Sequence, residues 1–307
     1  MRTLSQIVFV TGFFALNTQI YLCAGQTNLV AAIPIGKLAF VSSDSFGSAG
    51  EICVMSDQHR TMTLAFKTRE PEFLPDGKRI IYSANDSEAQ GIYIYDLKEQ
   101  TSTPLLTNIA NTEAPSWSPD GTKIAFEVYQ DGLKSSQIYT ANVNGSDVKQ
   151  LTEGQFYNWT PRWSPDGKKL VFETTRNDTP KTHRPGGYRD IYVMDSDGQN
   201  QINLTTNTFG HHPSWSPDGK SIAYMSHGII VMKADGSDKH NVSHGKTRDS
   251  EPVWSPDGQW IAFTRTSNNP HGPETMDIWV MKSDGTEQHQ VTFNKKYWSS
   301  YSPSWSW

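Results

Sequence analysis

Apolar and polar residues alternate along most of this chain in short runs that are typical of β-strands. Beyond residue 35, each repeating unit holds four such runs, separated by Gly, Asp, Asn and Pro. The first run ends in an aromatic residue, as in "PSWSPDG" at 115–121, and an apolar triplet at 124–126 begins the second. The third run has the form "IYVMD" and the fourth the form "INLT". The pattern predicts an all-β protein built from four-stranded units.

The turns between these runs have their own repeated chemistry. A Ser-Pro-Asp-Gly sequence follows the first strand, where Pro fixes φ, Asp bonds locally and Gly accepts a positive φ. Asn-Gly or Asp-Gly pairs between the third and fourth strands predict tight hairpins. These pairs are Asn144-Gly145, Asp197-Gly198, Asp235-Gly236 and Asp284-Gly285. The geometry of a tight turn between strands is sufficient to explain the residues at both kinds of turn, so neither indicates a functional site.

The aromatic residue that ends the first strand recurs 39 to 52 residues apart, which is the spacing of propeller blades. Its positions are Phe73, Trp117, Trp163, Trp215, Trp254 and Trp305. A four-stranded sheet cannot bury both of its faces alone, so neighbouring units are expected to stack. Six copies predict six blades.

The two ends of the chain are expected to share one blade. Residues 36–66 supply three strand-like runs that match the second, third and fourth strands of a unit. The missing first strand is found at 303–306, and we predict that it pairs with the strand at 37–42. Such a ring leaves no free sheet edge. The predicted fold is therefore a six-bladed β-propeller closed by three N-terminal strands and one C-terminal strand.

The first 25 residues have the layout of a secretory signal peptide: Arg2, an apolar run at 7–16, and small residues at 23–25. The apolar run is too short to span a bilayer. We therefore expect a periplasmic or secreted protein that is not integral to the membrane. Cleavage after residue 24 or 25 would leave Cys53 without a disulfide partner. The predicted segments are a signal peptide at 1–25, a linker at 26–35 and the propeller at 36–307.

Charge and motifs narrow the classes of function. A mild net charge of −5 does not suggest a nucleic-acid or membrane-surface partner. The sequence has no Gly-x-Ser-x-Gly elbow, no His-Glu-x-x-His motif and no phosphate-binding loop. We expect a monomer that binds a partner and does not catalyse a reaction.

The phrase "WSPDGxxIAF", followed by "IYVMD" with an Asp-Gly turn and by "LT", resembles the repeat of TolB-like β-propellers (PD40, WD40-like repeats). The resemblance covers 36–307 and leaves out the α/β domain that precedes the propeller in TolB. It implies that the channel mouth receives a peptide segment of an envelope protein and can hold calcium. Similar repeats also occur in oligogalacturonate lyases.

The candidate binding residues lie just before each aromatic strand, where the variable loops meet the channel mouth. They are Glu70, Glu113, Trp159, His211, His212, Asp249, Glu251, Trp298 and Tyr301. Aromatic residues commonly anchor protein interfaces, and converging carboxylates can hold a cation. The calcium candidates are Glu70, Glu113 and Glu251. A solvated polar rim with no ligand is the alternative interpretation.

A second hypothesis from another class remains open. Four histidines are expected on the variable face, at His183, His211, His212 and His271. A metal-dependent polysaccharide lyase would use such residues, whereas histidines scattered on loops are commonly plain surface residues. Metal-dependent turnover of a sugar-acid oligomer would distinguish the lyase from the binding scaffold.

Overall fold

The protein was analysed as a computed structural model of the 307-residue chain. The structure describes residues 26–29, 33–34, 36–43, 50–56, 61–85, 90–177, 189–206, 209–244, 248–267, 274–294 and 299–306.

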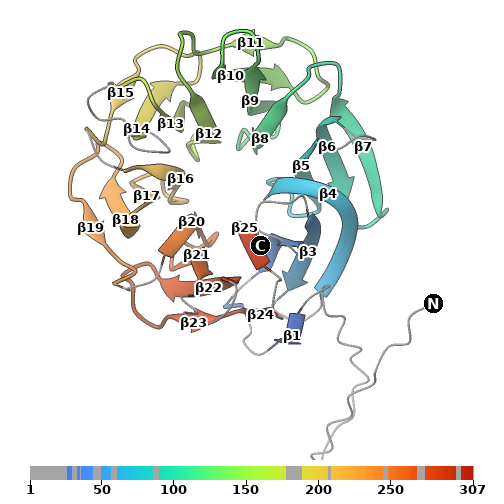
Figure 1. The fold of residues 1–307 in the computed structure, drawn as a ribbon, viewed down its shortest axis with the longest axis vertical. Helices are drawn as coiled ribbons and strands as arrows, with labels where there is room; N and C mark the ends of the chain where they lie inside the picture. The colour runs from blue at the N-terminus through green and yellow to red at the C-terminus, as the bar shows by residue number, and fades with distance from the viewer. Residues whose placement is uncertain are drawn as a thin grey trace, which may run out of the picture.

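Six four-stranded blades surround a central axis, as the sequence predicts (Figure 1). Blade 1 contains the second half of β4 (Thr61–Phe73), β5 (Arg79–Asn85), β6 (Gln90–Asp96) and β7 (Thr101–Leu106). Blade 2 contains β8 (Thr112–Trp117), β9 (Lys123–Gln130), β10 (Ser135–Asn142) and β11 (Lys149–Gln150). Blade 3 contains β12 (Asn158–Trp163), β13 (Lys169–Thr174), β14 (Asp190–Asp195) and β15 (Ile202–Asn203). In each blade the first strand lies nearest the axis.

Blade 4 contains β16 (His211–Trp215), β17 (Ser221–Ser226), β18 (Gly228–Lys233) and β19 (His240–Asn241). Blade 5 contains β20 (Arg248–Trp254), β21 (Trp260–Thr266), β22 (Met276–Lys282) and β23 (His289–Gln290). Blade 6 contains β25 (Ser299–Ser306), β2 (Lys37–Ser43), β3 (Gly50–Ser56) and the first half of β4. A short additional pair, β1 (Gln26–Leu29) with β24 (Thr292–Asn294), lies at the outer edge of the ring.

The predicted closure is confirmed, and it is longer than predicted. β25 pairs antiparallel with β2 from Lys37↔Ser306 to Ser43↔Ser299. The long strand β4 then joins blade 6 to blade 1, because it pairs with β3 at its beginning and with β5 at its end. The strands β2 and β25, far apart in the sequence, thus lie side by side in one blade, and the continuous strand β4 links that blade to the next.

The Ser-Pro-Asp-Gly turns have the predicted geometry. In blade 2, Ser118 Oγ donates to Asp120 Oδ1 at 2.6 Å, and the amide of Lys123 donates to Ser118 Oγ at 2.9 Å. Gly121 has a φ of 69°, in the left-handed region. The same Ser–Asp hydrogen bond recurs at Ser164–Asp166, Ser216–Asp218 and Ser255–Asp257. Each turn is therefore closed by its own side chains.

The core lies between the blades. Trp163, Leu170 and Phe172 of blade 3 form one cluster with Ala125 and Ile138 of blade 2. The largest fully buried side chains include one phenylalanine from the second strand of several blades: Phe40, Phe126, Phe172 and Phe263. Burying such a side chain stabilises the fold by about 1.5–3 kcal/mol. Stacking of neighbouring blades therefore makes the ring a stiff scaffold.

The expectation that Cys53 has no disulfide partner concerns the chain after cleavage, and it stays a prediction. Cys53 on β3 is fully buried and disulfide-bonded in the structure of the whole chain. The chain has one other cysteine, Cys23, which lies outside the described residues. Within the part of the chain that the structure describes, no helix is long and apolar enough to cross a membrane.

Candidate functional site

Each innermost strand contains a β-bulge directly before its Pro-x-aromatic sequence. One residue there has a φ of 48° to 54° and is followed by proline: Glu70, Ala114, Thr160, His212, Glu251 and Ser302. The strand register shifts at this point in all six blades. A left-handed φ is uncommon for residues other than glycine and costs about 1–3 kcal/mol where the structure enforces it. A bulge of this kind redirects the side chain at its position relative to the regular alternation of the strand.

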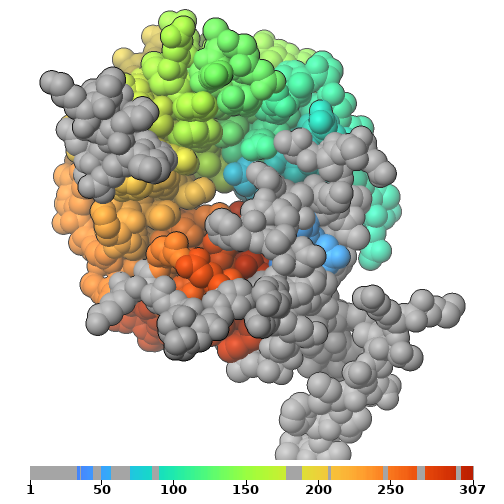
Figure 2. Space-filling model, in the orientation of Figure 1, coloured from blue at the N-terminus to red at the C-terminus, as the bar shows by residue number. Residues whose placement is uncertain are grey.

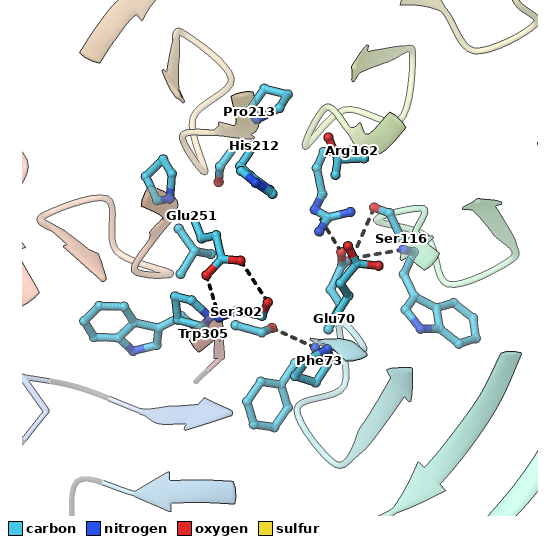
Figure 3. A pocket seen from close by; sticks show the side chains of 18 of the residues that line it. Glu70, Phe73, Ser116, Arg162, His212, Pro213, Glu251, Ser302 and Trp305 are labelled. Carbon is cyan, nitrogen blue, oxygen red and sulfur yellow. Dashed lines mark hydrogen bonds and ion pairs between the residues drawn. The ribbon is translucent and has the colours of Figure 1, made fainter. Parts of the chain in front are cut away.

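Five of these six residues, all except Ala114, line a central cavity of about 240 Å³. Glu70, Arg162, His212 and Glu251 point into it from four different blades (Figure 3). An opening is also visible at the centre of the ring in the space-filling view (Figure 2). The bulges lie in the first half of each inner strand, away from the Ser-Pro-Asp-Gly turns. From the bulges, the lining of the cavity extends along the inner strands to aromatic residues that end them, among them Phe73, Trp117 and Trp163.

Two carboxylates in the cavity wall join neighbouring blades. Glu251 of blade 5 accepts from the amide of Ser302 in blade 6 at 2.8 Å and from Thr264 Oγ1 at 2.7 Å. Glu72 of blade 1 accepts from the amide of Trp117 in blade 2 at 3.0 Å and lies 3.5 Å from Arg162 Nε of blade 3. These interactions fix the relative positions of the inner strands that form the cavity wall.

Glu70 differs from these two groups because its carboxylate is incompletely paired. Its Oε2 is buried and has no hydrogen-bond partner among the described residues. Burial raises the pKa of Glu70 to about 7, against the opposing charge of Arg162, and Glu113 and Glu251 raise it further. The carboxyl group can therefore gain or lose a proton near neutral pH.

A second hollow, the inter-blade pocket, lies between blades 2 and 3 on the same face. It measures about 300 Å³, and its lining consists of Asn111, Glu113, Glu127, Tyr129, Ser136, Tyr157 and Trp159. Tyr129, Tyr157 and Trp159 stack in order with ring-centroid distances of 6.4 Å and 4.8 Å. We call these three rings the aromatic ladder. The guanidinium of Arg189 lies 4.1 Å from the Trp159 ring centroid.

The two buried glutamates on the second strands of blades 2 and 3 have opposite environments. Glu173 accepts from Arg189 Nη1 at 2.9 Å and from Thr160 Oγ1 at 2.8 Å, and it lies 3.2 Å from His211 Nδ1. Burial alone would raise its pKa, but the bond from His211 and the Arg189 charge hold the pKa of Glu173 well below its usual range. Among the described residues, no such cation offsets Glu127: burial, Glu70 and Glu113 raise its pKa well above the usual range.

The structure places the predicted site residues in several separate locations. Glu70, His212 and Glu251 line the central cavity, whereas Glu113 and Trp159 line the inter-blade pocket. His211 lies beside Glu173, as described above. The buried carboxylate of Asp249 accepts two hydrogen bonds from Arg265, at 2.7 Å and 2.8 Å. Tyr301 pairs with Val41 on the closing strand, and Trp298 lies outside the described residues.

The calcium site predicted from the sequence is not preformed among the described residues. The described residues include no group of three or more His, Cys, Asp or Glu side chains arranged to hold a metal ion. Calcium binding by Glu70, Glu113 and Glu251 stays a prediction. Of the four histidines of the lyase hypothesis, His183 and His271 fall outside the described residues.

Sequence reasoning missed Glu127 and Glu173 as site residues. Both follow the buried phenylalanine of a second strand, in "KIAFEVY" and "KLVFETT". An acidic residue within a buried apolar run is unusual, because an unpaired buried charge is costly. That irregularity was the available signal. Sequence reasoning also missed Tyr129 and Tyr157, which have no distinguishing pattern in the sequence.

Comparisons with known proteins agree with this architecture. Residues 35–185 match the family model described as the TolB beta propeller domain, PD40. An uncharacterised protein of Agrobacterium fabrum is 32% identical over 156 residues, which cover 49% of this chain and 52% of that protein. The Tol-Pal system protein TolB of Francisella tularensis subsp. mediasiatica is 32% identical over 159 residues, covering 51% of this chain and 34% of that protein. The chain thus spans about half the length of the first relative and about a third of the second.

The fold comparison extends over most of the chain. The crystal structure of TolB from Acinetobacter baumannii superimposes with a TM-score of 0.71 at 21% identity. The match covers 88% of this chain and 66% of that one. At this identity the likeness establishes the propeller fold alone.

Proposed function

Since this chain is a β-propeller protein of the TolB (PD40) type, we propose that it is an exported scaffold that binds a segment of a partner protein. The segment would enter at the channel mouth, on the face that carries the variable loops and the inter-blade pocket. The partner would be an envelope protein, and the location periplasmic or secreted. Both expectations follow from the leader-like sequence at 1–25 and from the relative's description as a Tol-Pal system protein.

The observation that carries this proposal is the row of six strained bulges. A left-handed φ before proline costs free energy in every blade, and such strain is typically retained at binding or catalytic sites. In five of the six blades, the bulge residue lines a common cavity. The result is a polar concave surface on a stiff ring, which can bind a partner segment with little reorganisation of its own.

The aromatic ladder supports a polypeptide ligand on the same face. Aromatic residues provide large contact areas and are enriched among residues that dominate binding energy. Trp159 is half-buried and Tyr129 is 37% exposed, so both can contact a ligand at the pocket. By contrast, the Ser-Pro-Asp-Gly turns are closed by their own hydrogen bonds and serve the fold.

Selection from a displayed random-peptide library on the full chain tests the proposal without knowledge of the natural partner. Peptides that bind wild type should lose about thirtyfold in affinity for Trp159→Ala, since a buried interfacial aromatic contributes roughly 2 kcal/mol. Ile202→Ala is the matched control, because Ile202 is 55% exposed on the outer strand of the same blade. Circular dichroism would establish that both variants are folded.

Two results would contradict the proposal. One is a library that yields no specific peptide. The other is a set of selected peptides that bind the folded Trp159→Ala variant as tightly as wild type. If those peptides instead lost affinity for Ile202→Ala, the binding surface would be the outer rim of the blades.

A further inference from the structure

A large groove lies between blades 3 and 4, at the ends of the inner strands that carry the Ser-Pro-Asp-Gly turns. Its lining includes these turns of both blades, the outer strand β15 of blade 3 (Figure 1) and the hairpin of blade 4 that contains Asp235. Its volume is about 730 Å³, against about 240 Å³ for the central cavity. Ligand sites commonly measure about 300–1,000 Å³. The groove is therefore large enough for a partner segment and separate from the channel mouth.

The floor and the lip of this groove are apolar. Val193, Leu204 and Trp215 line it and are each less than 10% exposed. Ile202 also lines it, stands directly opposite Val193 in the strand register of blade 3, and is 55% exposed. Single exposed apolar residues are ordinary, whereas one that continues into an apolar hollow is typical of an interaction site.

The exposed isoleucine is a departure from the repeat. The equivalent pairs of the third and outer strands are Thr140↔Lys149 in blade 2, Val231↔His240 in blade 4 and Val280↔His289 in blade 5. In blade 2, Lys149 Nζ donates to the carbonyl of Asp197 in the hairpin of blade 3 at 3.2 Å, and so spans the boundary between the two blades. Ile202 cannot make such a bond across the next boundary. The fold of a blade therefore does not require an apolar residue here.

Three carboxylates surround the apolar floor. They are Asp166, Asp218 and Asp235, all of which are exposed. Each accepts a hydrogen bond from the hydroxyl of a serine two residues away, at 2.6 or 2.7 Å. That bond is the first of the interactions that hold the pKa of each carboxyl group below its ordinary value, so all three are ionised at neutral pH. Lys169, which also lines the groove, is paired with Asp195 at 2.9 Å.

We propose that this groove binds a segment of a second partner protein in which a large apolar side chain is flanked by lysine or arginine. The apolar side chain would pack against Ile202 and Val193, and the basic residues would lie beside the three carboxylates. Complementary charge favours this segment over an acidic one of equal hydrophobicity. The inference goes beyond the proposed function, because the groove would be occupied independently of the channel mouth and the ring would hold two partners at once.

The test uses the full chain and three designed peptides. Acetyl-Lys-Leu-Phe-Lys-amide has the proposed pattern, acetyl-Lys-Ser-Ser-Lys-amide lacks the apolar side chains, and acetyl-Glu-Leu-Phe-Glu-amide reverses the charge. Binding would be followed by NMR from the methyl signals of Val193 and Leu204. The first peptide should shift these signals, and the serine peptide should bind at least about tenfold more weakly, because it buries no large apolar side chain. The glutamate peptide should also bind more weakly, and added salt should reduce its difference from the first.

Two variants of the groove have matched controls. Ile202→Lys gives blade 3 the residue type that blade 2 has at this position, and it should weaken binding of the first peptide at least about tenfold. Asp235→Asn makes an Asn-Gly turn like that of blade 2, so the fold should be kept while binding weakens about two- to fivefold. Asp284→Asn, in the equivalent hairpin of blade 5, and Leu133→Ala, at a side chain that is also 55% exposed, should leave binding unchanged.

Equal binding of the three peptides, no shift with any of them, or full binding by the folded Ile202→Lys variant would overturn the inference. So would a dimer of the free chain in sedimentation that Ile202→Lys dissociates, because a second copy would then cover the groove. Peptides selected at the channel mouth should bind Ile202→Lys as tightly as wild type. If they do and the designed peptides fail, the scaffold function stands and the groove proposal falls.

Discussion

Removal of the closing strand should open the ring and cost most of the stability of the fold. Deleting residues 299–307 takes away every β2–β25 pairing, from Ser43↔Ser299 to Lys37↔Ser306. It also removes Trp305, which is 8% exposed, and the buried hydrogen bond from the Phe73 amide to Ser304 Oγ at 2.9 Å. The freed edge of β2 would present unpaired amides and carbonyls to solvent and to other chains.

The magnitude follows from these losses. Truncating a buried tryptophan costs about 3–5 kcal/mol. The Phe73–Ser304 bond and the Glu251–Ser302 bond at 2.8 Å add about 1 kcal/mol each. A loss of roughly 5–7 kcal/mol is comparable with the whole stability of many domains, about 5–15 kcal/mol. At about 2–4 °C per kcal/mol, the melting temperature should fall by at least about 10 °C.

Thermal melting followed by circular dichroism would measure this loss, with deletion of residue 307 alone as the control. A synthetic peptide of residues 299–307 added to the truncated chain should restore part of the stability, and a scrambled peptide should not. Melting of the truncated protein within a few degrees of the full chain would refute closure by the C-terminal strand.

Two more predictions concern stability. Because burial raises the pKa of Glu70 to about 7 from an ordinary value of 4.5, the folded state holds a proton that the unfolded state releases. Stability should therefore fall as the pH rises from about 4.5 to 7, and Glu70→Gln should flatten this slope in urea titrations; an unchanged slope would contradict the assignment. Ser164→Ala removes the bonds to Asp166 and to the Lys169 amide, and it should lower the free energy of unfolding by about 1–2 kcal/mol while the folded fraction keeps its peptide affinity. Altered affinity would mean that this turn takes part in binding.

The sequence was sufficient for the ring because the fold is repetitive. Each copy of the turn and of the aromatic strand repeats the same local chemistry, so alternation and spacing determine strands, blade number and closure. The pairing of 303–306 with the first strand followed from counting which strands were missing. Even the positive φ of Gly121 followed from the turn type.

The site could not be read from the sequence with the same accuracy, because bulges alter the register. By position, Glu113 was grouped with Glu70 and Glu251, yet the bulge residue of its strand is Ala114. A shift of one residue reverses the face to which a strand side chain points. Glu113 therefore faces Glu127 in the inter-blade pocket. The interaction that makes Glu127 a site residue comes from the next blade, and no local pattern encodes it.

The location of the bound segment is the most direct test of the scaffold account. Hydrogen exchange of the full chain would be compared with and without a selected peptide at saturating concentration. The account predicts slower exchange in the inner strands at the mouth, over 112–116 and 157–162. Exchange in the turns at 118–122 and 164–168 should stay unchanged. Protection confined to those turns, or to the outer strands of the blades, would contradict binding at the channel mouth.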